Sequence, residues 1–140
     1  MSLSATVTNG GKMNLKSLAA GAAAALLMMG CRTVPILNVK DAPVNVAAGQ
    51  TASLASVEQA IVRAGTGLGW SMKVEKPGLI VGTLNLRTHS AVVEIPFTAS
   101  SYSILYRNSA NLEQEGDTIH KNYNGCVQNL DQAIRRQLMI

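Results

Sequence analysis

Residues 70–106 carry the feature that most restricts the fold, because their apolar residues recur at the spacing of β-strands. Apolar and polar residues alternate within four short runs, and turn residues such as Pro77 and Gly78 separate the runs. Short connections join strands as antiparallel neighbours, so a four-stranded antiparallel meander is predicted. The expected strands are residues 70–75, 79–87, 91–99 and 101–106.

A first helix is predicted within residues 53–70, ahead of these strands. Its apolar residues share one face at helical spacing, and their small size favours close packing against a sheet. Ser56 with Gln59 fits a capping box, whereas Thr51 or Ser53 would cap the helix one turn earlier. The face expected in the core consists of Val57, Ala60, Ile61 and Ala64.

A second helix is predicted from about Asp117, and its periodicity is the strongest in the chain. Asp117 or Thr118 can cap its start. Gly125 lies inside the pattern, where glycine costs about 1 kcal/mol relative to alanine. We expect Gly125 to allow close approach to the sheet or to mark the end of the first turn. The apolar positions are Ile119, Tyr123, Cys126, Val127, Leu130, Ala133, Ile134 and Leu138.

These elements predict an α+β fold, in which an antiparallel sheet of about four strands packs against an N-terminal and a C-terminal helix as a two-layer sandwich. A chain of 140 residues holds one domain, which we place at residues 51–140. Residues 31–50 are expected to be a tether. Within it, Val34–Val39 and Val44–Ala47 are candidates for short edge strands.

Residues 13–30 have the organisation of a secretion signal. Lys16 forms a short positive region, Ser17–Met29 form an apolar region, and a small residue follows. The apolar run is too short to cross a bilayer, which requires about 20 apolar residues. Residues 1–12 fit no part of a signal. They are either an over-extended start, with translation beginning at Met13, or a disordered extension.

The end of this segment, Met28-Met29-Gly30-Cys31, resembles the lipobox of bacterial lipoprotein precursors, although leucine and then alanine or serine are commoner at the two methionine positions. The resemblance implies cleavage between Gly30 and Cys31, a diacylglycerol on the Cys31 sulfur and a third acyl chain on the new amino group. No other cofactor is expected. Arg32 in place of aspartate favours the inner leaflet of the outer membrane, facing the periplasm. The alternative is a structural Cys31 buried in an N-terminal helix.

The charge balance gives no reason to expect a nucleic acid as partner. The formal net charge is +4, with 12 basic and 8 acidic residues. Lys12 and Lys16 precede Cys31, so 10 basic and 8 acidic residues, a net +2, remain from Cys31 onward. Nucleic-acid binding is typical of a concentrated basic stripe, and the sequence contains none.

Three segments, AIVRAGTGLGWSM, HSAVVEIPFTASSYSILYRNSANL and IHKNYNGCVQNLDQAI, resemble a group of small proteobacterial lipoproteins of unassigned function. The resemblance covers roughly residues 51–138 and implies an α+β fold and a location in the cell envelope. It implies no activity. The pattern of the group has an aromatic residue, usually tryptophan, at the position of Cys126. The smaller cysteine is expected to leave a partly filled void.

His89, His120 and Cys126 are the candidates for catalysis or metal binding, but no nucleophile elbow surrounds any serine. His89 is expected to be solvated in a hairpin, and His120 to be a neutral, hydrogen-bonded structural residue at a helix start. Cys126 is expected to be a buried inert thiol, with an intermolecular disulfide as the alternative. Two histidines and a remote thiol fall short of a metal site, so none is predicted.

Tyr102, Tyr106 and Arg107 are the candidate binding surface, on the last predicted strand. Tyrosine and arginine are enriched at binding surfaces because they combine apolar area with a polar group. The alternative is that both tyrosines alternate inward to the core.

The expected function is a non-enzymatic, lipid-anchored module that binds a protein or another component of the envelope. The first alternative is a small hydrolase or ligand carrier that uses His120 near a cleft. The second is a homodimer formed through an exposed sheet edge.

Overall fold

The computed structural model describes residues 32–140. The predicted signal at residues 13–30, the residues before it and the predicted lipid-bearing Cys31 lie outside the described residues. Residues 34–140 form one compact unit. None of the helices in the described part of the chain combines the length and the apolar character that crossing a bilayer requires.

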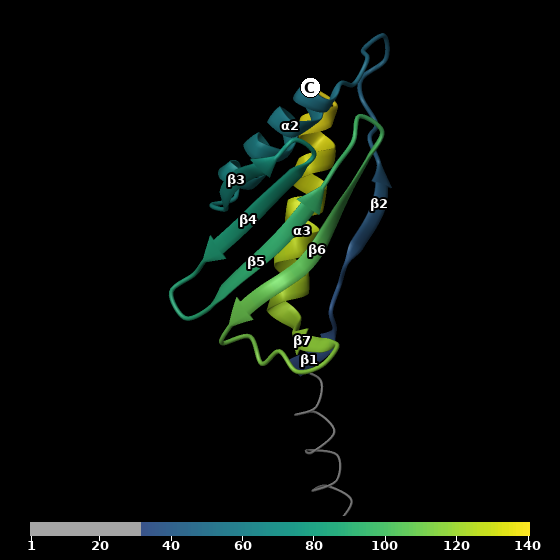
Figure 1. The fold of residues 1–140 in the computed structure, drawn as a ribbon. Helices are drawn as coiled ribbons and strands as arrows, with labels where there is room; N and C mark the ends of the chain where they lie inside the picture. Colours follow the sequence, from purple (N-terminus) through teal and green to yellow (C-terminus); the bar gives the residue numbers. More distant parts are fainter. Residues whose placement is uncertain (1–31) are drawn as a thin grey trace, which may run out of the picture. The chain divides into compact units, whose positions relative to one another are not determined.

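The main sheet contains β2 (Val39–Pro43), β3 (Ser71–Lys76), β4 (Leu79–Asn85), β5 (Ser90–Pro96) and β6 (Ser101–Ala110). Its five strands are antiparallel and lie in the order β2-β6-β5-β4-β3 (Figure 1). The strands β3 to β6 are the predicted meander. With the two helices described below, this sheet confirms the predicted α+β class.

β2 is a fifth strand, where about four were predicted. It pairs with β6, with Ala42 opposite Tyr102, so part of the predicted tether belongs to the sheet. The short β1 (Thr33–Pro35) pairs with β7 (Thr118–His120) in a separate two-stranded sheet. Residues 44–47, a predicted edge strand, form no strand. Each of these short segments depends on a neighbour for its hydrogen bonds, so its own sequence does not determine its structure.

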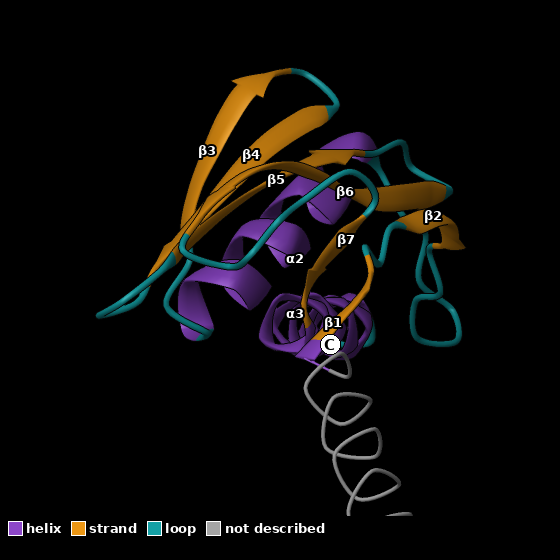
Figure 2. Cartoon of the chain, turned by 90° about the horizontal axis from the view of Figure 1, so that it is seen from below, coloured by secondary structure: helices purple, strands orange, loops and turns teal. Residues whose placement is uncertain are grey.

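The two helices, α2 (Leu54–Gly67) and α3 (Lys121–Leu138), lie on the same side of the sheet (Figure 2). Ser53 caps α2, and Ser53 and Ser56 each accept a hydrogen bond from the backbone N–H of the other. The cap is therefore one turn earlier than the Ser56 box and agrees with the alternative prediction. The predicted core face of α2 is buried: Val57, Ala60, Ile61 and Ala64.

A glycine lets α2 approach β3 closely. A Cβ at Gly65 would lie 2.4 Å from the Met72 sulfur, which is closer than two such atoms can approach. A larger residue at this position would therefore require the flexible Met72 side chain to move.

α3 starts later than the sequence predicted. Ile119 is fully buried within β7, and the helix begins at Lys121 with His120 as its N-cap. Asp117 and Thr118 therefore do not cap it, because the β1–β7 pairing keeps residues 118–120 extended. Seven of the eight predicted apolar positions are buried: Ile119, Tyr123, Val127, Leu130, Ala133, Ile134 and Leu138.

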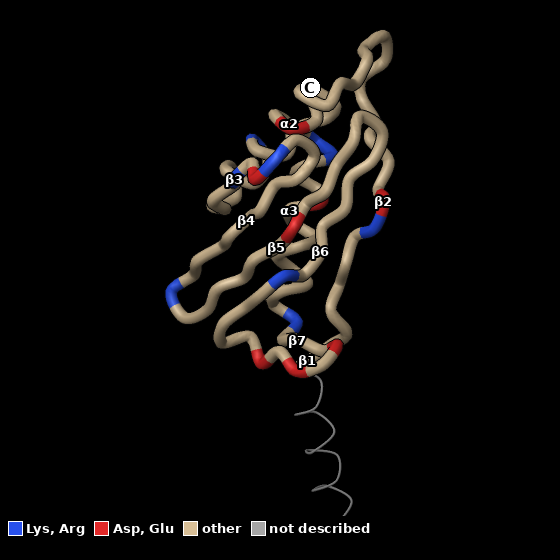
Figure 3. Tube along the Cα trace, viewed as in Figure 1, with Lys and Arg blue, Asp and Glu red and all other residues tan. Residues whose placement is uncertain are grey.

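The opposite face of the sheet is mixed, with partly exposed apolar residues such as Val81, Val92 and Leu105 beside polar and charged side chains. Arg107 lies 3.6 Å from a Glu94 carboxylate oxygen and 3.7 Å from one of Glu75, and all three side chains are about two-fifths exposed. Exposed ion pairs of this kind contribute little, about 0–1 kcal/mol each. Acidic and basic positions are intermixed along the chain in Figure 3, with no continuous basic stripe in view.

Both edge strands of the main sheet carry features that hinder pairing with another chain. β3 has a bulge between Val74 and Lys76 and presents two lysines. β2 has an irregular register, a residue with positive φ at Asp41 and a terminal Pro43. Lysines, prolines and bulges are the devices with which proteins protect sheet edges.

Candidate functional site

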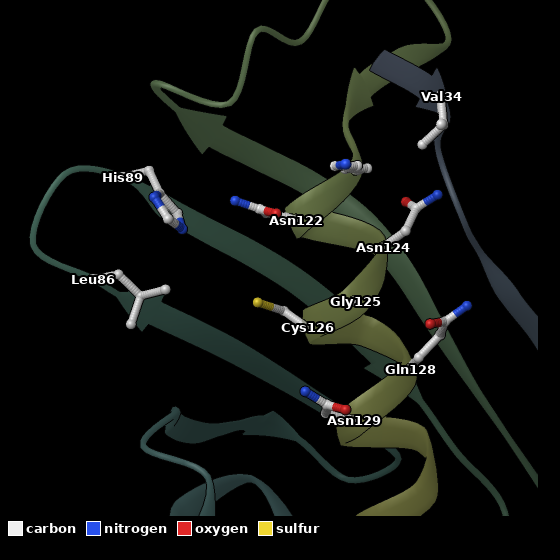
Figure 4. Close-up of a pocket in the computed structure, with 10 residues that line it drawn as sticks. Val34, Leu86, His89, Asn122, Asn124, Gly125, Cys126, Gln128 and Asn129 are labelled. Atoms are coloured by element: carbon white, nitrogen blue, oxygen red, sulfur yellow. The ribbon is translucent and has the colours of Figure 1, made fainter. Parts of the chain in front are cut away.

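A hollow of about 670 Å³ lies between the first half of α3 and the turn that joins β4 to β5 (Figure 4). The turn side of this α3 hollow carries Leu86 and His89, which face the helix across the gap. The complete lining consists of Val34, Leu86, His89, Lys121, Asn122, Asn124, Gly125, Cys126, Gln128 and Asn129.

The unequal lengths of the two helices account for the position of the hollow. At 1.5 Å per residue, the 14 residues of α2 span about 21 Å and the 18 residues of α3 about 27 Å. α2 ends at Gly67, and the chain turns back there into β3. The β4–β5 turn therefore faces α3 with no second helix between them.

A smaller side pocket of about 190 Å³ adjoins the α3 hollow and shares Leu86, Cys126 and Asn129 with it. Its other walls are apolar. Leu68 and Leu86 are 41% and 45% exposed, which is high for large apolar side chains. The complete lining of the side pocket consists of Leu68, Trp70, Leu84, Leu86, Cys126 and Asn129.

Besides that of Asn124, three carboxamides line the hollow: those of Asn122 and Asn129 point toward the β4–β5 turn, and that of Gln128 points to the other side of α3 (Figure 4). Among the described residues, none of these three side chains makes a hydrogen bond within the protein, and all three are exposed. Each carboxamide offers two N–H donors and one carbonyl acceptor. Lys121 is the only permanently charged residue of the lining, which contains no carboxylate.

Asn124, on the same helix, already uses its carboxamide to hold main chain. Its Oδ1 accepts a hydrogen bond of 3.0 Å from the Leu37 N–H, and its Nδ2 donates one of 2.9 Å to the Pro35 carbonyl. The residues before β2 are thereby fixed against α3.

Gly125 does not have the role that its place in the helix suggested. A Cβ built at Gly125 has no neighbouring atom within 4 Å, so the glycine is not there to let the sheet approach. It also lies four residues inside the helix, beyond the first turn. Gly125 lines the hollow, where the missing side chain leaves the helix backbone accessible.

We expect Gly125→Ala to raise the free energy of unfolding by about 0.5–1 kcal/mol, because alanine has the higher helix propensity and its methyl group enters open space. Denaturant unfolding of the two proteins measures the difference. Gly65→Ala is the matched comparison, and it should gain less stability because the Met72 side chain has to move to admit the methyl group. A loss of stability in Gly125→Ala would show that packing does require glycine there.

Cys126 is half-buried and lines both the hollow and the side pocket, rather than lying wholly in the core. Figure 4 shows its sulfur directed into the gap toward the β4–β5 turn. Burial raises the pKa of the Cys126 thiol. The protonated thiol is a poor nucleophile, so this environment does not activate the residue.

His89 differs from its predicted surroundings, whereas His120 has the structural role that was predicted for it. His89 is only partly exposed and lines the hollow, where its Nδ1 lies 3.3 Å from the Thr88 hydroxyl. His120 does not line the hollow. Its Nδ1 accepts a hydrogen bond of 3.1 Å from the Asn122 N–H, which requires that nitrogen to be unprotonated.

His120→Ala is expected to lower the free energy of unfolding by about 1 kcal/mol, because the first turn of α3 loses its capping acceptor. His120→Asn supplies another side-chain acceptor and should restore most of the loss. Thermal unfolding followed by circular dichroism measures both variants. Equal stability of wild type and His120→Ala would contradict the capping role.

The candidate surface of Tyr102, Tyr106 and Arg107 is not one surface. Tyr102 is 1% exposed, and its hydroxyl donates a hydrogen bond of 2.5 Å to Asp131 on α3. Tyr106 packs edge-on against Tyr123, with ring centres 5.5 Å apart. Both tyrosines face the helices, whereas Arg107 lies on the opposite face of the sheet. The alternative prediction, inward alternation of the tyrosines, describes them correctly.

The hollow was not predicted from the sequence, although the sequence of α3 contains one signal of it. Polar or small residues at positions 122, 125, 126 and 129 recur at helical spacing, on the flank of the apolar stripe of α3. Such a flank is normally solvated, and only the β4–β5 turn opposite makes it a wall. Among the described residues, no group of three or more His, Cys, Asp and Glu side chains could hold a metal ion.

No protein-family model matches the chain, and the comparisons with curated proteins and with solved structures found no match either.

Proposed function

We propose that the chain is a lipid-anchored lipoprotein of the bacterial cell envelope, and that its α+β domain binds a ligand in the α3 hollow without catalysis. The lipobox-like Met28-Met29-Gly30-Cys31 supports lipid attachment to Cys31. Arg32 at the next position supports the outer membrane, with the domain facing the periplasm.

One observation carries the binding role, namely that the hollow combines three unpaired carboxamides with an apolar side pocket. Ligand sites are typically apolar hollows with a few polar groups that fix the orientation of the ligand. The Asn122, Gln128 and Asn129 side chains supply the polar groups here. Leu68 and Leu86 supply accessible apolar area beside them.

The chemistry of the hollow favours binding over hydrolysis. The Cys126 thiol is held protonated by burial, and His89 contacts Thr88 rather than an activated nucleophile. His120, the base of the hydrolase alternative, is occupied in capping α3. A nucleophile needs a base within hydrogen-bond distance to be activated, and these contacts supply none at the hollow.

The alternative of a homodimer through a sheet edge has less support. Both edges of the main sheet carry bulges, and β3 adds lysines while β2 adds a proline. Each of these features opposes the addition of another strand.

A photo-crosslinking residue at position 128 tests occupancy of the hollow in living cells. We expect a discrete crosslinked adduct from Gln128, which lines the edge of the hollow on the side of Asn124. Gln132 is the matched control, because it is an exposed glutamine of the same helix outside the lining. The adduct should weaken when Gly125→Leu places a bulky side chain in the middle of the hollow. Equal adducts from positions 128 and 132, or none from either, would contradict the proposed function.

A further inference from the structure

We infer that the occupant of the α3 hollow is an extended polypeptide segment of a partner protein, held by its main chain and by one bulky apolar side chain. This inference rests on the proposed function, because it names the class of ligand for the same site.

The protein itself shows how α3 recognises extended chain. Asn124 binds the Pro35 carbonyl and the Leu37 N–H with a single carboxamide, which satisfies an acceptor and a donor of one extended segment. Residues 36 and 37 form no strand, so the side chain replaces a strand partner there. The carboxamides of Asn122 and Asn129 offer the same pair of groups from the adjoining face of α3.

The spacing of these two carboxamides fits a second extended segment. Seven residues of α-helix separate Asn122 from Asn129, or about 10 Å along the axis. An extended chain covers about 10 Å in three residues. The two side chains can therefore each hold main-chain groups of one short segment that runs along the helix.

Gly125 lies between the two carboxamides and leaves room for that segment. Open space above its Cα lets the main chain of a partner approach the helix backbone. A glycine with no packing reason inside a helix carries a stability cost, which a binding role accounts for.

The charge and shape of the lining select among ligands. Lys121 lines the hollow and no carboxylate does, so the part of the occupant that lies in the hollow is neutral or negatively charged. Alternate side chains of an extended segment point to opposite sides, so one of them can enter the apolar side pocket beside Leu68 and Leu86. Trp70 is 4% exposed and offers no open ring face, which disfavours a stacked sugar.

The test is selection of an mRNA-displayed pool of random linear dodecapeptides on the full chain in detergent. We expect enriched peptides that contain a bulky apolar residue and few lysines or arginines. Asn122→Ala and Asn129→Ala should each weaken their binding about five- to tenfold. Gln132→Ala, at an exposed α3 position outside the hollow, should leave binding unchanged.

Main-chain recognition has a more specific test. N-methylation of single amides in an enriched peptide should weaken binding to the wild type about tenfold at one or two positions. The same methylation should have little effect on the asparagine variant that has lost the matching carboxamide. Recognition of peptide side chains alone would not make the effect of a methylated amide depend on one particular asparagine.

The inference is overturned if no peptides are enriched, or if enriched peptides bind wild type and Gly125→Leu equally. Gln132→Leu is the control for the added leucine. Glycan strands of peptidoglycan freed of stem peptides form a separate arm, and their binding at the hollow without peptide binding would also overturn it. A crosslinked adduct at position 128 together with failed peptide selection would refute the peptide class while leaving the proposed function standing.

Discussion

Cys31→Ser is expected to abolish lipid attachment and to leave the precursor uncut, with its apolar leader still in place. In the proposed lipoprotein the Cys31 thiol is the nucleophile that takes up the diacylglycerol, and a serine hydroxyl does not replace it in lipoprotein precursors of this kind. Three acyl chains anchor a protein durably, because each buried methylene contributes about 0.8 kcal/mol, whereas a single chain binds only marginally. The expected change is therefore from a fully lipidated chain to one that carries no lipid.

Intact-mass spectrometry of the membrane fraction measures this change. The wild type should appear in the membrane fraction, at the mass of a chain that starts at Cys31 and carries lipid. Cys126→Ser is the matched control, since it removes the other cysteine of the chain and should leave attachment intact. A wild-type mass with a free Cys31 thiol and the leader still present would refute the lipoprotein assignment.

The stability of the domain is expected to fall steeply above pH 10. Burial, and then the hydrogen bond to the Asp131 carboxylate, raises the pKa of Tyr102 well above its usual 10.0. Burial likewise raises the pKa of Tyr123, whose hydroxyl has no hydrogen-bond partner among the described residues. Both phenols therefore stay protonated in the folded state at pH values where they ionise in the unfolded chain.

Proton linkage gives the direction in which the free energy of unfolding changes with pH. Below pH 10 both states hold these protons, so the two tyrosines make no change in stability with pH. Above pH 10 the unfolded state loses them first, and each tyrosine lowers the free energy of unfolding by about 1.4 kcal/mol per pH unit. Together the two tyrosines are expected to lower the free energy of unfolding by about 4 kcal/mol between pH 9 and pH 11.5. Urea unfolding over this range, followed by far-ultraviolet circular dichroism, measures the loss.

Two phenylalanine variants separate this effect from general alkaline damage. Tyr102→Phe and Tyr123→Phe should each remove about half of the pH dependence. At pH 7 they should differ, because Tyr102→Phe loses a bond to a charged partner and costs about 1.5–3 kcal/mol. Tyr123→Phe removes a buried hydroxyl without a partner and should be neutral or about 1 kcal/mol more stable. An unchanged pH dependence in both variants would contradict the assignment.

The sequence determined those parts of the fold that depend on periodicity. Alternation in residues 71–106 specified four strands and their antiparallel order, because a strand with one buried face must alternate. Helical spacing specified the buried faces of both helices, including Val57, Ile61, Leu130 and Ile134. Alternation also placed Tyr102 and Tyr106 together on one side of β6, with Arg107 on the other.

Tertiary structure decided whatever depends on a distant neighbour. β2 exists because β6 offers it an edge, and His120 rather than Asp117 caps α3 because β7 pairs with β1. The hollow arises because α2 is shorter than α3, so that one flank of α3 faces the β4–β5 turn. No local pattern contains that juxtaposition, since a polar helix flank has the same sequence whether it faces bulk water or a binding site.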